Sequence, residues 1–87
     1  MTQVNDIDMD NLRHMLGAGP HTKKSKWGYR NFFAPTSAYI QSMERLEEAG
    51  FVRKGRPFLD NHYYHATEAG CAAAGLKPYQ VRRALGL

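Results

Sequence analysis

The sequence predicts one small α+β domain, mostly helical, with three to five helices and a single β-hairpin. Residues 37–49, SAYIQSMERLEEA, carry apolar residues at helical spacing and are followed by Gly50, a common helix stop. Two short β-prone runs, 51–54 and 62–66, flank a segment rich in turn formers. A chain of 87 residues with 43% hydrophobic and 23% charged residues suits one globular domain, residues 1–87.

The first helix is predicted over residues 6–16, DIDMDNLRHML. Its apolar residues recur three or four positions apart, which is typical of a helix with one buried face: Met9, Leu12, Met15 and Leu16. Aspartates near its start suit the positive end of the helix dipole. Gly17, Gly19 and Pro20 then end it.

Residues 20–35 admit more than one interpretation. Tyr29, Phe32 and Phe33 stand at helical spacing, which predicts a short helix over 26–33 that ends before Pro35. A strand or an ordered loop is the alternative. In either case we expect Phe32 and Phe33 to fill the core of so small a domain.

The helix over 37–49 is the clearest element, and Thr36 is its expected N-cap. A helical wheel places apolar side chains on one face: Tyr39, Ile40, Met43 and Leu46. The opposite face carries polar residues: Ser37, Gln41, Glu44, Arg45 and Glu48.

The two β-prone runs predict an antiparallel hairpin with Arg56 at its tip. Alternation along the strands favours Val52 and Tyr64 in the core. Thr67 is placed to cap a further helix, and Pro78 suits the first turn of a last one.

Two stretches, RLEEAGFVRK and YYHATEAGCAAAGL, resemble the winged helix-turn-helix family of small bacterial and phage regulators over residues 43–76. The first is similar to the end of a recognition helix that enters a wing strand, and the second to the returning strand and the next helix. The resemblance implies a winged-helix fold and duplex DNA binding in transcriptional or phage-related regulation. The glycine-containing segment before the recognition helix departs from the family pattern.

DNA binding requires residues that read bases and residues that contact phosphates. The exposed candidates for base reading are Ser37, Gln41 and Arg45. The candidates for phosphate contacts are Lys23, Lys24, Lys26, Arg30, Arg53, Lys54 and Arg56. This hypothesis requires the separate cationic segments to converge on one face. The alternative is that Gln41 and Arg45 are ordinary helix surface, with Arg45 paired to Gln41 or Glu48.

A second hypothesis is a protein-interaction module, such as a phage-type modulator of a host protein. Its motivation is the stretch KKSKWGYRNFF, where Trp27 is the candidate partner contact. A homodimer is compatible with either hypothesis, and the last helix could supply the contact through Tyr79, Val81 and Leu85.

Several classes of function have no sequence support. No apolar run approaches the roughly 18 residues of a membrane span, the acidic N-terminal stretch does not resemble a secretion signal, and the single Cys71 suits a reducing cytoplasm. His62 and His65 should point to opposite faces of a strand, so they do not predict a shared metal. We therefore expect no enzyme, no metal and no cofactor, with Cys71 as a small buried residue.

Overall fold

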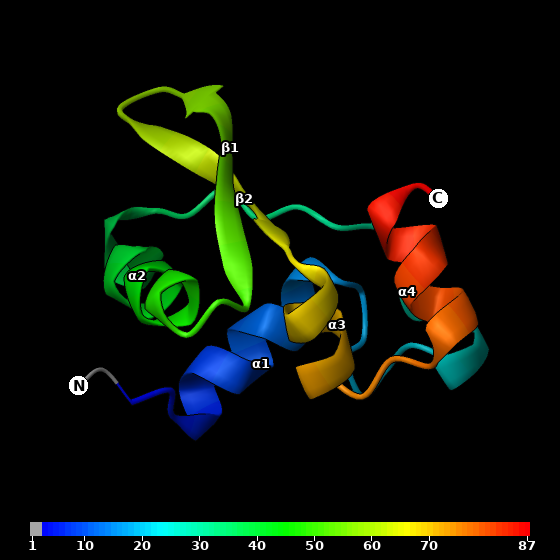
Figure 1. Ribbon diagram of the computed structural model, residues 1–87. Helices are drawn as coiled ribbons and strands as arrows, with labels where there is room; N and C mark the ends of the chain where they lie inside the picture. The colour runs from blue at the N-terminus through cyan, green and yellow to red at the C-terminus, as the bar shows by residue number, and fades with distance from the viewer. Residues whose placement is uncertain (1–2) are drawn as a thin grey trace.

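The computed structural model describes residues 3–87 and confirms the α+β prediction (Figure 1). Within this range the elements are α1 (Asp6–Met15), η1 (Lys24–Lys26), η2 (Ser37–Tyr39), α2 (Ile40–Glu48), β1 (Val52–Phe58), β2 (Asn61–Ala66), α3 (Glu68–Ala73) and α4 (Pro78–Leu85), where η denotes a 3-10 turn. The first two residues of the acidic N-terminal stretch lie outside the described range. The hairpin after α2 is consistent with a small winged-helix-like arrangement.

Helices α1 and α2 pack against each other and supply much of the core. Their fully buried side chains are Leu12, Met15, Met43 and Leu46, as the helical spacing predicted. The prediction fails at Tyr39, which is exposed, because residues 37–39 form a 3-10 turn and not the first turn of an α-helix. Thr36 precedes this turn but makes no side-chain capping hydrogen bond, so its expected capping role is wrong.

The predicted helix over 26–33 is absent, and the segment forms a turn followed by extended chain. Phe33 makes two backbone hydrogen bonds of 2.9 Å with Tyr64, so it adds an isolated bridge to the free edge of β2. Gly28 has a φ of +86°, which is incompatible with a right-handed helix. Phe33 is half-buried as expected, whereas Phe32 is exposed and does not join the core.

The hairpin is antiparallel and carries a bulge between Lys54 and Pro57. The expected position of Arg56 at the hairpin tip is wrong, because β1 extends to Phe58 and Arg56 lies in the bulge. The register of the hairpin pairs Val52 with Ala66 and Lys54 with Tyr64, and paired residues share a face of the sheet. Val52 and Tyr64 are both buried, which confirms the predicted inward face. Beyond this base the hairpin projects away from the helices (Figure 1).

Helices α3 and α4 complete the domain on the side away from α2 (Figure 1). Thr67 caps α3 by accepting a hydrogen bond of 3.1 Å from the Gly70 amide, and Pro78 occupies the first turn of α4, both as predicted. The turn η1 lies against α4, because the Gln80 amide donates a hydrogen bond to the Lys24 carbonyl. Residues 23–26 are therefore placed by α4 and not by α2.

Candidate nucleic-acid interface

The N-terminal end of α2 is open to solvent. Ser37 and Gln41 are exposed, as predicted for base-reading residues. The C-terminal half of the same helix carries Glu44 and Glu48, which are also exposed. The exposed carboxylate of Glu44 would repel a polyanion from the second half of α2, whereas residues 36–43 at its beginning contain no acid.

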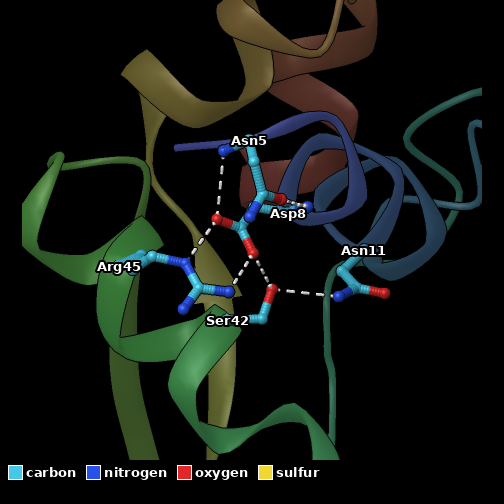
Figure 2. A network of polar contacts seen from close by, with 5 residues as sticks. All are labelled: Asn5, Asp8, Asn11, Ser42 and Arg45. Atoms are coloured by element: carbon cyan, nitrogen blue, oxygen red, sulfur yellow. Dashed lines mark hydrogen bonds and ion pairs between the residues drawn. The ribbon is translucent and has the colours of Figure 1, made fainter. Parts of the chain in front are cut away.

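Arg45 does not have the free guanidinium that base reading requires. Its Nε and Nη2 donate hydrogen bonds of 2.7 and 2.9 Å to the two carboxylate oxygens of Asp8 on α1 (Figure 2). This bidentate ion pair links α1 to α2. We therefore do not retain Arg45 as a base-reading candidate, and its partner is on another helix instead of one turn away.

Asp8 is completely buried at the centre of this contact, and hydrogen bonds from its neighbours stabilise its negative charge. The Ser42 hydroxyl donates to Asp8 Oδ1 at 2.5 Å, and the Asn5 amide donates to Oδ2 at 3.2 Å (Figure 2). The Arg45 guanidinium, opposed by burial and assisted by Ser42 and Asn5, lowers the pKa of Asp8 from 3.8 to about 2. Asp8 is thus a structural anion. Its position four and seven residues before Leu12 and Met15, on the apolar stripe of α1, is the sequence signal that could have identified it.

The hairpin carries three exposed cations: Arg53, Lys54 and Arg56. Their sequence neighbourhood is short of acids, since Asp60 in the turn is the one acidic residue between Gly50 and Thr67. Arg53 pairs with His65 and Lys54 with Tyr64, so their side chains leave opposite faces of the hairpin. Positive charge therefore surrounds the hairpin.

The remaining phosphate-contact candidates lie elsewhere. Lys23, Lys24 and Lys26 are exposed around η1, beside α4 and on the other side of the molecule from α2 (Figure 1). Arg30 is committed to the end of α1, where it donates hydrogen bonds of 3.2 and 2.7 Å to the His14 carbonyl. The expected convergence of all cationic segments on one face is therefore not observed. The η1 lysines instead lie near cations of α4.

Trp27 is less exposed than a free partner contact would be. Its ring packs against the core, and its Nε1 donates a hydrogen bond of 3.2 Å to the Thr22 carbonyl. The Lys24 ammonium lies 5.9 Å from the ring centroid. Among the exposed aromatic side chains, sequence reasoning did not identify Phe32 and Phe58, which lie next to Tyr63 on the hairpin.

Other reactive groups have structural surroundings. Cys71 is buried as predicted, and burial raises the pKa of its thiol to about 11, which keeps it neutral. Over residues 3–87 no three His, Cys, Asp or Glu side chains are grouped so that they could hold a metal ion. Within the same range no helix has the length and apolar character needed to cross a membrane.

Comparison of the chain with protein-family models, curated proteins and solved structures gives no match. The resemblance to winged-helix regulators therefore stays a prediction, supported by the arrangement of α2 and the hairpin.

Proposed function

We propose that the protein binds duplex DNA through a smaller surface than the sequence predicted, without the η1 lysines or Arg30: the hairpin and the N-terminal end of α2, as in a small winged-helix regulator. The observation that carries this proposal is the set of three exposed cations on a hairpin that directly follows α2. Cations on a projecting hairpin can neutralise phosphates beside the groove in which a helix lies.

Base reading in this proposal belongs to the start of α2. Gln41 is exposed in the first turn of α2, and Ser37 is exposed in the turn η2 that precedes it. A glutamine amide can form two hydrogen bonds with adenine in the major groove. The helix dipole adds a weak attraction for phosphate at the same end. The exposed glutamates at the other end favour an orientation in which only the first turn enters the groove.

The proposal predicts that hairpin cations matter more than the equally numerous η1 lysines. A triple variant, Arg53→Gln, Lys54→Gln and Arg56→Gln, is compared with a charge-matched control, Lys23→Gln, Lys24→Gln and Lys26→Gln. Binding is measured by fluorescence anisotropy on labelled duplex DNA over a salt series. Each lost phosphate contact should reduce the slope of log affinity against log salt by about 0.9. We expect the hairpin variant to lose roughly tenfold or more in affinity at low salt, and the control to lose much less.

Two results would contradict the proposal. One is wild-type protein that shows no salt-dependent binding even at low salt. The other is an equal loss in both triple variants, which would indicate attraction by net charge without a defined site. The protein-contact alternative has less support, because its candidate contact, Trp27, packs on the core and is not free to meet a partner.

A further inference from the structure

One face of the hairpin points away from the core and gathers aromatic side chains. The register pairs Arg53 with His65 and Phe58 with Asn61, and alternation places Tyr63 on the same face. Phe32 reaches this face from the neighbouring extended segment, where its ring meets Tyr63. We call this set the outer face: Phe32, Arg53, Arg56, Phe58, Tyr63 and His65.

The rings of the outer face are in mutual contact yet open to solvent. Tyr63 lies 6.4 Å from Phe32 at an interplanar angle of 76°, and 4.7 Å from Phe58 at 46°, between ring centroids. Phe32 keeps 51% of its surface exposed and Phe58 keeps 36%. The core is built without these rings, so their exposure marks a surface available to a ligand.

A hollow of about 400 Å³ is lined by the rings of Phe32 and Tyr63 and by the side chains of Arg56 and His65. The bulge in β1 includes Arg56, and Gly55 beside it leaves room for the His65 ring, which an added β-carbon would meet at 2.4 Å. The His65 Nδ1 is 2.7 Å from the Asn31 carbonyl oxygen, which fixes the ring orientation. Three segments, β1, β2 and the chain at residues 31–32, therefore position the side chains that line the hollow.

Asn31 also holds the segment that bears Phe32 against β2. Its Oδ1 accepts a hydrogen bond of 2.6 Å from the Ala66 amide, and its Nδ2 donates one of 3.1 Å to the Ala66 carbonyl. Phe32 is thus exposed but attached to an ordered strand edge. A ligand that stacks on its ring would lose little binding free energy to ordering the site.

We propose that the outer face binds an unpaired nucleotide, with the base stacked on the exposed Phe32 ring beside Tyr63 and the phosphate at Arg56 and Arg53. Exposed rings beside two arginines, in a set of six residues that contains no acidic one, match a base attached to a phosphate. Bases inside an intact duplex cannot offer their faces to a ring. This inference rests on the proposed DNA binding and specifies its substrate as DNA with a locally unpaired stretch.

The test uses one DNA sequence in three labelled forms: intact duplex, duplex with a short central bubble, and single strand. Stacking on one aromatic side chain corresponds to about five- to 150-fold in affinity, so we expect the bubble to bind at least fivefold more tightly than the duplex. Phe32→Ala should reduce this ratio toward one. Tyr79→Ala is the matched control, since Tyr79 is 50% exposed on α4 beside Arg83. Phe32→Trp retains a stacking surface and should retain the preference, and circular dichroism verifies folding of each variant.

The outcomes separate this inference from the proposed function. Salt-dependent duplex binding without a bubble preference, or equal effects of Phe32→Ala and Tyr79→Ala, overturns the outer face alone. Binding of single strand and bubble without binding of duplex supports the outer face and overturns the duplex proposal. Absence of binding to all three forms overturns both. A bubble preference that Phe32→Ala abolishes and Phe32→Trp keeps supports the inference.

Discussion

Asp8→Asn is expected to lower the free energy of unfolding at neutral pH by about 2 kcal/mol. The pKa of Asp8 falls from 3.8 to about 2, which at about 1.4 kcal/mol per pKa unit sets an upper value of about 2.5 kcal/mol for the charge contribution. Asparagine keeps the size of the side chain but cannot carry the charge that Arg45 binds. Urea unfolding followed by circular dichroism at pH 7 measures the difference.

The pH dependence of this loss gives a sharper test. Because the folded-state pKa is below the unfolded value, the contribution of Asp8 is fully present above pH 3.8 and is lost as the pH falls through about 2. The stabilities of wild type and Asp8→Asn should therefore converge between about pH 4 and pH 2. A gap that stays constant over this range would show that the loss comes from packing and not from the ion pair.

Asp10→Asn is the matched control for this experiment. Asp10 is on the same helix but exposed, and its carboxylate is 3.4 Å from Arg13 in a surface pair. Such pairs contribute little, so we expect a change within about 0.5 kcal/mol and no convergence with pH.

The elements that local sequence determines were predicted well. Helical spacing located α1 and α2, and Thr67 and Pro78 marked the starts of α3 and α4. The hairpin followed from its β-prone runs and turn residues. The fold class therefore depends on patterns that a short window of sequence contains.

The segment before α2 was predicted wrongly because its conformation depends on distant partners. Phe33 is extended since it pairs with Tyr64, and Asn31 is held by Ala66. Neither partner can be read from the spacing of Tyr29, Phe32 and Phe33, which fits a helix equally well. Tertiary hydrogen bonds select the extended conformation over the helix in this segment.

The candidate site was predictable only in part for the same reason. A helical wheel correctly predicted that Ser37 and Gln41 are exposed. It could not show that Arg45 binds a buried Asp8 on another helix. The outer face required the bulge and the bridge at Phe33, which set the register of the aromatic side chains. Both features are absent from local sequence patterns.

Gly70→Ala is the second substitution with a large expected effect. Gly70 lies in α3, directly over the backbone that connects α2 to β1, and a β-carbon there would be 1.9 Å from the Phe51 carbonyl oxygen. Alanine in a helix normally gains about 1 kcal/mol over glycine. Here the clash is with backbone and cannot be relieved by rotating a side chain.

Relief of this clash would require α3 to move away from the α2–β1 junction. That movement would stretch two hydrogen bonds, from the Thr67 amide to the Phe51 carbonyl at 3.0 Å and from the Thr67 hydroxyl to the Gly50 carbonyl at 2.6 Å. We expect a net destabilisation of about 2–3 kcal/mol and a fall in Tm on the order of 10 °C. Gly19→Ala, where an added β-carbon meets nothing within 4 Å, should leave Tm unchanged or slightly raised. Equal Tm values for Gly70→Ala and wild type would show that α3 is free to shift, and that the base of the hairpin is not fixed by this contact.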